Sequence, residues 1–409
     1  MTRYLIIIIS LVLCIACKKE NKTKVAPQFL KSGPWKASLA LQDGEELPFL
    51  FEAFDDQTIK VFNAEEVIDV DQVRVVGDSI FIHFPVFEGY IAATFKDSMT
   101  FSGSFIKESV DRKVPFTASY GVQDRFNVIS KPITDITGNW EAVFSEDTDD
   151  DRYIAKGIFK QNGNIITGTF RTTTGDYRYL EGVLNKNQLQ LSTFDGAHAF
   201  LFEATVTDST MSGNFYSGNH WKEPFTAVRN ENFKLPSEDS LTFLKKGYDS
   251  LAFSFPNEKG DLISLSDDQF KNKVCVVQVM GTWCPNCMDE TKYFTEYYKN
   301  KPSDVEFVAL AFEYAKTPEK AFKAIDKLRS KLEIQYPIIL AQYGTSNKKK
   351  AQEKLPMLNH VLSYPTTIFI DKKGKVRKIH TGFNGPATGQ KYIDYKEEFE
   401  SFVAMLVAE

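Results

Sequence analysis

Two cysteines stand three positions apart in residues 283–287, which read Trp-Cys-Pro-Asn-Cys. This spacing places both sulfurs at the start of one helix, close enough to form a small disulfide that is easily reduced. Pro285 suits the first helical turn, where its missing N–H is not needed. The free N–H groups and the positive dipole end there favour a thiolate on Cys284. We therefore predict that Cys284 is the exposed nucleophile and that Cys287, one turn deeper, resolves the mixed disulfide.

A Cys-x-x-Cys pair could also be half of a zinc site or an inert structural disulfide. Zinc would need a second pair of ligands, and the five histidines are scattered without ligand spacing. An apolar strand at 274–280 leads directly into the motif at a helix start, which is the arrangement that redox work requires. We therefore expect redox chemistry by the thiols themselves, with no metal and no other cofactor.

The first 17 residues have the features of an export signal. Arg3 precedes an apolar run at 5–13, and the small Ala16 stands immediately before Cys17. The run is short for a membrane span, which takes about 20 apolar residues. The pattern resembles a bacterial lipobox, so we expect residues 1–17 to be a lipoprotein signal, Cys17 to carry lipid into a bilayer, and residues 18–30 to form a tether. An uncleaved anchor and an ordinary secretory signal are the alternatives.

Cysteine usage and charge narrow the class of protein further. Cys14 leaves with the signal, and Cys275 lies on the apolar strand, where cysteine behaves as a small hydrophobe. An exported protein that is stabilised by several disulfides would carry more cysteines than this one. The net charge of -5 is spread along the chain and offers no basic face, so nucleic-acid binding is disfavoured.

The N-terminal half contains a duplication. Residues 33–37 match 138–142 and residues 115–118 match 224–227, at nearly the same offset. Within each repeat, 31–121 and 135–229, apolar residues alternate and Asn, Asp and Gly punctuate the runs, which predicts short antiparallel strands. Each repeat could be a barrel or sandwich, or both could build one joint barrel, and a barrel could hold a ligand or be filled by side chains.

The spacing of the apolar residues changes after a polar stretch at 230–249, which we interpret as a linker or short connecting helix. Residues 250–409 form the next predicted domain. The pattern predicts a hairpin at 253–265, strands at 274–280, 305–312, 336–341, 366–370 and 375–380, and helices at 287–299, 317–332 and 392–407. Such alternation gives a central sheet with helices on both faces. The expected architecture is a duplicated all-β region followed by an α/β domain.

Residues 281–287 with Glu290, together with residues 363–367 (Ser-Tyr-Pro-Thr-Thr), resemble the TlpA/ResA-like branch of thioredoxin-fold proteins. The resemblance covers about 253–406. It implies that Pro365 is cis and lies against the active-site sulfurs, so that the preceding backbone at Tyr364 can pair with a substrate strand. The remaining implied site residues are Trp283 and Asn286 beside the sulfurs, Glu290 as a group that tunes them or relays protons, and Gln278, which stands where thioredoxins have a buried acid.

The resemblance also implies a function. We expect a membrane-anchored, periplasm-facing reductase of disulfides in substrate proteins, including apocytochrome c, supplied with electrons by a membrane thiol donor. An oxidase or isomerase would use the same fold. A thiol peroxidase is a second class, although Val277 and Gly281 stand where peroxidases have Pro and Thr. The third class is a binding lipoprotein in which the β repeats do the main work.

Overall fold

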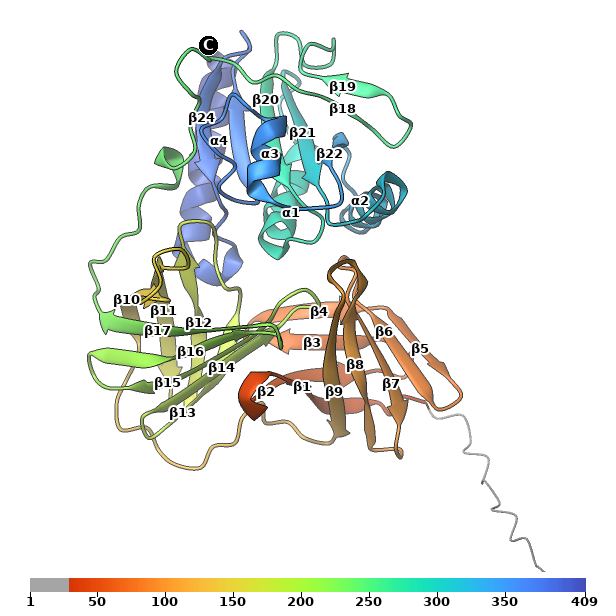
Figure 1. The fold of residues 1–409 in the computed structure, drawn as a ribbon, viewed down its shortest axis with the longest axis vertical. Coiled ribbons are helices and arrows are strands. Elements are labelled where there is room, and N and C mark those ends of the chain that lie inside the picture. Colours follow the sequence, from red (N-terminus) through yellow and green to blue (C-terminus); the bar gives the residue numbers. More distant parts are fainter. Residues whose placement is uncertain (1–28) are drawn as a thin grey trace, which may run out of the picture.

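The computed structural model describes residues 29–409, and the predictions for Cys14, Cys17 and the signal lie outside them. The chain forms three units, with two β units side by side and an α/β unit above them (Figure 1). None of the helices within residues 29–409 combines the length and the hydrophobicity needed to cross a membrane.

The first repeat folds into a nine-stranded antiparallel sheet in the order β4-β3-β2-β1-β9-β8-β7-β6-β5. Its two edge strands, β4 and β5, are consecutive in the chain but are not paired, so this sheet does not close. The strands are β1 (Gly33–Ala40), β2 (Glu46–Ala53), β3 (Ile59–Asn63), β4 (Glu66–Val70), β5 (Gln72–Val76), β6 (Ser79–His83), β7 (Tyr90–Phe95), β8 (Thr100–Lys107) and β9 (Arg112–Tyr120).

The second repeat closes into an eight-stranded antiparallel barrel, because β17 pairs with β10. The two repeats are therefore separate sheets, and the single joint barrel is ruled out. The barrel strands are β10 (Gly138–Phe144), β11 (Tyr153–Asn162), β12 (Ile165–Thr172), β13 (Leu180–Asn185), β14 (Gln188–Phe194), β15 (Ala199–Val206), β16 (Thr210–Ser217) and β17 (Trp221–Arg229).

The duplication is visible in matching contacts at the start of each sheet. The indole N–H of Trp35 donates to the carbonyl oxygen of Lys31 at 2.8 Å, and that of Trp140 donates to Ile136 at 2.9 Å. Both indoles are completely buried. A buried indole N–H needs a hydrogen-bond partner, and both Trp residues find one four positions earlier in the chain.

The interior of the barrel is packed with aromatic rings. Phe170 lies 5.0 Å from Phe202 and 5.5 Å from Phe144, measured between ring centroids, and all three are buried. Rings at these distances fill the space that a ligand would need. Of the two predicted alternatives, the side-chain-filled barrel is the one observed.

The two β units share part of their core. Phe194, at the end of β14, stacks on Phe49 of the first sheet with 4.2 Å between ring centroids. Arg125, in the segment that joins the repeats, is buried and donates to the hydroxyl of Ser192 at 3.1 Å and to the carbonyl oxygen of Phe62. Because a buried guanidinium must keep such partners, the first sheet is fixed against the barrel.

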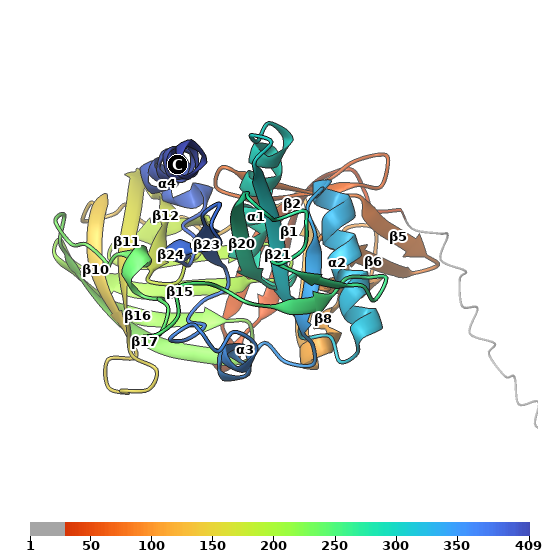
Figure 2. The same cartoon turned by 90° about the horizontal axis from the view of Figure 1, so that it is seen from above.

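The C-terminal unit has a five-stranded sheet in the order β22-β21-β20-β23-β24, in which β20, β21 and β22 are parallel. The mixed sheet and its helices confirm the predicted α/β domain, and Figure 2 shows α3 and α4 on opposite sides of the sheet. The elements are β18 (Ser254–Pro256), β19 (Leu262–Ser264), β20 (Val274–Met280), α1 (Pro285–Lys299), β21 (Val305–Phe312), α2 (Pro318–Leu332), β22 (Ile338–Gln342), α3 (Lys348–Lys354), β23 (Thr366–Ile370), β24 (Val376–Thr381) and α4 (Gln390–Ala408).

The predicted elements of this unit lie within a few residues of the observed ones. The hairpin is formed by β18 and β19, and Thr317 caps α2 as its side chain accepts from the N–H of Lys320 at 3.4 Å. The sequence did not predict α3, because its seven residues include a single buried one, Ala351. The cap from Asn347, whose side chain accepts from two backbone N–H groups, stabilises this short helix.

The connecting stretch 230–249 is attached to the C-terminal unit along its second half. It contains a short 3-10 turn, Glu238–Ser240. Asp239 forms an ion pair with Lys378 at 2.8 Å, and the buried hydroxyl of Thr242 bonds to that of Thr381 at 2.9 Å. These contacts limit how far the C-terminal unit can move from the barrel.

All three units meet at one buried guanidinium. Arg178, in the loop between β12 and β13, forms ion pairs with Glu66 of β4, Asp195 of the barrel and Asp289 of α1. The Arg178 side chain is 2% exposed, Asp195 and Asp289 are buried with it, and the Glu66 side chain is 12% exposed. Burial alone would lower the pKa of Arg178, but these carboxylates raise it above its ordinary value and keep the group charged.

We predict that Arg178→Ala lowers the free energy of unfolding by about 3–5 kcal/mol, because it leaves the buried carboxylates of Asp195 and Asp289, and the partly buried one of Glu66, without their cation. Urea denaturation followed by tryptophan fluorescence measures this loss. Arg74→Ala, at an exposed position on β5, is the matched control and should change stability by less than about 0.5 kcal/mol. Equal effects of the two substitutions would contradict the role of Arg178.

Candidate active site

The two sulfurs lie at the N-terminus of α1. Cys284 and Cys287 form a disulfide with 5.2 Å between their Cα atoms. Cys284 is the N-cap residue, and its sulfur accepts from the backbone N–H of Cys287 at 3.1 Å. Pro285 occupies the first helical turn. The N–H groups and the dipole of this helix end therefore point at the sulfur that would carry negative charge after reduction.

The prediction that Cys284 is exposed is wrong. Cys284 is 6% exposed and Cys287 is completely buried. The barrel loop at 173–179 contacts Asn286 of the motif and Ser363 beside it. Within this loop, the carbonyl oxygen of Thr174 accepts from the hydroxyl of Ser363 at 2.9 Å, and that of Asp176 accepts from the side-chain amide of Asn286 at 3.2 Å.

Gly175 allows this loop to come close to the motif. Its φ is +151°, and a Cβ at this position would lie 2.1 Å from the side-chain nitrogen of Asn286. It also forms a parallel bridge with Phe383, after β24. Any larger residue would push the loop away from Asn286. A contact between residues about 110 positions apart left no signal in the sequence.

The segment before β23 forms a second side of the site. The Tyr364–Pro365 peptide bond is cis, and the carbonyl oxygen of Tyr364 lies 3.4 Å from the sulfur of Cys284. The ring of Trp283 packs edge-on against that of Tyr364 at 5.5 Å, and its indole N–H donates to the carbonyl oxygen of Phe312 at 2.9 Å. Trp283 and Tyr364 therefore enclose the sulfur pair on one side.

A buried carboxyl lies one turn beyond Cys287. Glu290 is completely buried, and its two oxygens accept from Gln278 at 2.8 Å, Thr367 at 2.7 Å and Tyr395 at 3.3 Å. Burial raises the pKa of Glu290 to about 7, against the lowering effect of these hydrogen bonds. Gln278 thus does not replace the buried acid of thioredoxins. Instead it binds a carboxyl that the helix supplies.

Sequence reasoning missed a second buried carboxyl, Glu313, which follows β21. Its oxygens accept from the backbone N–H of Thr282 at 2.8 Å and from the Thr282 hydroxyl at 2.7 Å. Burial raises the pKa of Glu313 to about 7. The place of Glu313 could be predicted from the sequence, because β20 and β21 are parallel neighbours whose carboxyl ends share one edge of the sheet. An acid after β21 is therefore placed beside the residues that precede Cys284.

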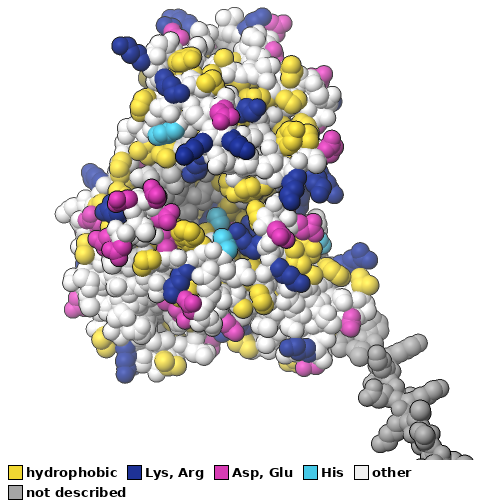
Figure 3. Space-filling view, viewed as in Figure 1, with side chains coloured by type: hydrophobic (Ala, Val, Ile, Leu, Met, Phe, Trp, Pro, Cys, Tyr) yellow, Lys and Arg dark blue, Asp and Glu magenta, His cyan; other side chains and the backbone are white. Residues whose placement is uncertain are grey.

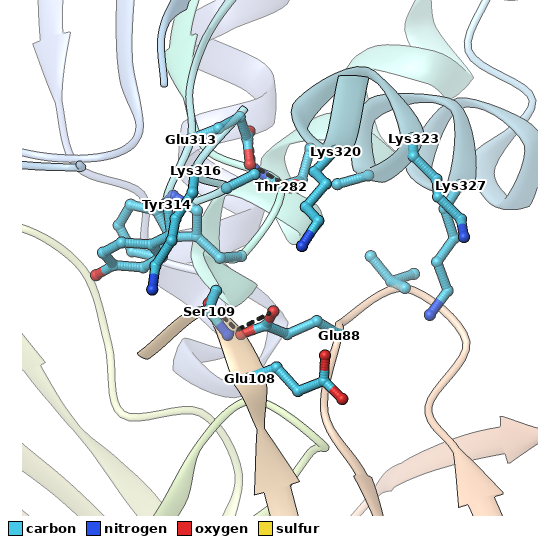
Figure 4. A pocket seen from close by; sticks show the side chains of 14 residues that line it. Glu88, Glu108, Ser109, Thr282, Glu313, Tyr314, Lys316, Lys320, Lys323 and Lys327 are labelled. Carbon is cyan, nitrogen blue, oxygen red and sulfur yellow. Dashed lines mark hydrogen bonds between the residues drawn. The ribbon is translucent and has the colours of Figure 1, made fainter. Parts of the chain in front are cut away.

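Glu313 borders a charged cavity of about 490 Å³ on the far side of Trp283. Figure 4 shows lysine side chains from α2 on one side of it and Glu88 and Glu108 of the first sheet on the other. Lys327 donates to the carbonyl oxygens of Phe84 and Phe87 at 2.8 Å each. The α/β unit is thus held to the first sheet by charged groups.

A larger cavity of about 800 Å³ lies between the barrel and the sulfur pair. We call it the cleft. One wall is the barrel mouth, with Tyr153, Tyr177, Phe200, Trp221 and Glu223, and the other includes Trp283, Cys284, Asn286 and Tyr364. Figure 3 shows the surface hollowed between the upper and lower units, with hydrophobic and histidine side chains at its edge.

Within residues 29–409, no group of three or more His, Cys, Asp or Glu side chains could hold a metal ion. Cys275 is buried on β20, and burial raises the pKa of its thiol to about 12. A thiol with so high a pKa is a poor nucleophile near neutral pH.

The C-terminal unit is similar to known proteins. Residues 245–393 match the family described as Redoxin. The thioredoxin-like protein YneN of Bacillus subtilis (strain 168) is 27% identical over 139 residues, which cover 34% of this chain and 73% of YneN. The thiol-disulfide oxidoreductase ResA of the same organism is 28% identical over 140 residues, which cover 34% of this chain and 69% of ResA.

Part of this chain is also similar to solved structures. A thiol-disulfide oxidoreductase from Bacteroides fragilis NCTC 9343 has 21% sequence identity and a TM-score of 0.27, covering 36% of this chain and 99% of that one. The C-terminal domain of a thiol-disulfide oxidoreductase from Bacteroides thetaiotaomicron has 18% identity and a TM-score of 0.30, covering 39% of this chain and 97% of that one.

The paired cysteines on a thioredoxin-like fold define the C-terminal unit as a thiol-disulfide oxidoreductase. Its homologues are ResA and YneN, so the TlpA/ResA-like resemblance is confirmed for this unit. The Redoxin match begins after Arg229, where the barrel ends, and does not include the two β units.

We predict that Glu290→Gln changes how stability depends on pH. The folded-state pKa of Glu290 lies above its ordinary value, so its contribution is fully present below pH 4.5 and is lost as the pH rises towards 7. The variant keeps a neutral side chain and escapes this loss. Relative to wild type, it should gain up to about 3 kcal/mol between pH 4.5 and 8.

Chemical denaturation at a series of pH values measures this difference. Glu296→Gln, at an exposed position on the same helix, is the control and should follow wild type at every pH. If the free energies of unfolding of wild type and Glu290→Gln changed in parallel with pH, Glu290 would be ionised throughout pH 4.5–8. That result would contradict the prediction.

Proposed function

We propose that this protein is a reductase of disulfides in other proteins and that Cys284 and Cys287 carry the electrons. One observation carries the proposal. The sulfur of Cys284 caps a helix N-terminus, 3.4 Å from the carbonyl oxygen of Tyr364, with Cys287 bonded behind it. Cys284 borders the cleft, and Cys287, bonded to it, is the resolving thiol.

The reaction proceeds in two exchange steps. The thiolate of reduced Cys284 attacks one sulfur of a substrate disulfide, forms a mixed disulfide and releases the other substrate sulfur as a thiolate, which takes up a proton. The thiolate of Cys287 then attacks the sulfur of Cys284 and releases the second substrate thiol. Two electrons pass to the substrate, and the protein is left with the Cys284–Cys287 disulfide. A dithiol donor must reduce this disulfide before the next cycle.

We propose that Glu290 takes up and returns protons during these steps. It lies one turn beyond Cys287, and its pKa of about 7 means that both protonation states are populated near neutral pH. A carboxyl with this pKa can take up a proton as a thiol ionises and return it later. Gln278 and Thr367 hold its oxygens in place through the hydrogen bonds already described.

The proposed setting is the bacterial cell envelope. The export signal and lipobox pattern around Cys17 support a lipid anchor that leaves the folded units facing the periplasm. A membrane thiol protein would then be the electron donor. The family resemblance adds apocytochrome c as a substrate to be tested.

We predict that Cys284→Ser abolishes reduction of the disulfide in an unstructured Cys-x-x-Cys peptide, because serine cannot form the mixed disulfide. Cys287→Ser should instead accumulate a covalent complex with substrate, visible on a non-reducing gel. Cys275→Ser is the matched control and should keep wild-type activity, because its thiol is buried away from the pair. Full activity in Cys284→Ser would refute the proposed function.

A further inference from the structure

The cleft between the barrel mouth and the sulfur pair has no role in the two exchange steps. We propose that it is the substrate site, and that its occupant is an extended protein segment with an aromatic residue next to the reacting cysteine. This inference rests on the proposed function, because it names the substrate class of the same sulfur pair. The barrel is then a specificity element of the enzyme.

The position of Cys284 restricts what can reach it. Its sulfur belongs to a residue that is 6% exposed, at the base of a cleft of about 800 Å³. Cavities of roughly 300–1,000 Å³ hold ligands of drug size. A folded protein presents about 800 Å² of fairly flat surface to a partner and cannot insert it into such a space. A flexible segment of a few residues can enter and bring a sulfur to Cys284.

The walls of the cleft favour an aromatic side chain in that segment. Tyr153, Tyr177, Phe200 and Trp221 face it from the barrel, and Trp283 and Tyr364 face it from the α/β unit. Trp221 is 40% exposed, which is unusual for so large an apolar side chain. Aromatic pairs gain about 0.5–1.5 kcal/mol beyond the area that they bury.

The cleft also offers a hydrogen bond to a peptide. Within residues 29–409, the backbone N–H of Tyr364 donates no hydrogen bond, and Tyr364 lines the cleft. A polar group is costly to leave without a partner when its surroundings are desolvated. A backbone N–H beside the reacting sulfur can pair with an extended chain as a neighbouring strand would.

The barrel wall is firmly held. The hydroxyl of Tyr153 donates to Glu223 at 2.8 Å, and the buried Glu223 also accepts from Ser145 at 2.5 Å. The loop at 173–179 is fixed to the α/β unit through Asn286, Ser363 and the ion pair between Arg178 and Asp289. A wall fixed in this way selects among substrates because it does not open freely to folded ones.

The test compares two disulfide substrates with the full-length protein. One is an unstructured peptide disulfide with Phe beside each Cys, and the other is glutathione disulfide, which has no aromatic group. We expect Trp221→Ala to lower kcat/KM about three- to tenfold for the Phe peptide and to leave that for glutathione disulfide unchanged. Trp221→Phe should recover most of the loss, because it keeps an aromatic ring in the wall.

Tyr248→Ala removes an exposed aromatic residue outside the cleft and should leave both rates unchanged. An equal change on both substrates for Trp221→Ala, or no change on either, would overturn the proposed occupant. Failure of the wild-type protein to reduce either disulfide is a different result, because it would refute the reductase function itself.

Discussion

The guanidinium of Arg178 is the contact on which the arrangement of the three units depends. It lies in a loop of the barrel, and its ion pairs extend to the first sheet through Glu66 and to the active-site helix through Asp289. A buried charge cannot be left without partners, so each unit must keep its carboxylate in place. The same loop contacts Asn286 and Ser363 beside the sulfur pair. The contact that joins the three units therefore also positions one wall of the active site.

Two acids of the active site are buried. The helix N-terminus favours a thiolate on Cys284, while Glu290 and Glu313 are buried with pKa values of about 7. Ionised carboxylates beside a thiolate would raise its pKa by like-charge repulsion. Acids that stay partly protonated near neutral pH reduce this repulsion and can still exchange protons. Gln278 contributes by binding Glu290 without adding a charge.

Local patterns predicted the parts of the protein that local physics determines. The duplicated strands follow from alternating residues, the strand at 274–280 from its apolar run, and α2 from its Thr317-Pro318 start. The Cys-x-x-Cys pair at a helix N-terminus was predicted for the same reason. The burial of Cys284 and the role of Arg178 were not, because both depend on contacts between residues more than 100 positions apart. The unclosed first sheet also escaped prediction, since its strands alternate as those of the closed barrel do.

The central claim is that the Cys284–Cys287 pair donates electrons to substrate disulfides. Its midpoint reduction potential tests this most directly, measured on the full-length protein by equilibration with glutathione or dithiothreitol buffers and by counting free thiols. We expect a midpoint potential of about −200 mV or lower, in the range of glutaredoxins and thioredoxin. A value near about −120 mV, as in the oxidant DsbA, would contradict it and identify the pair as an electron acceptor.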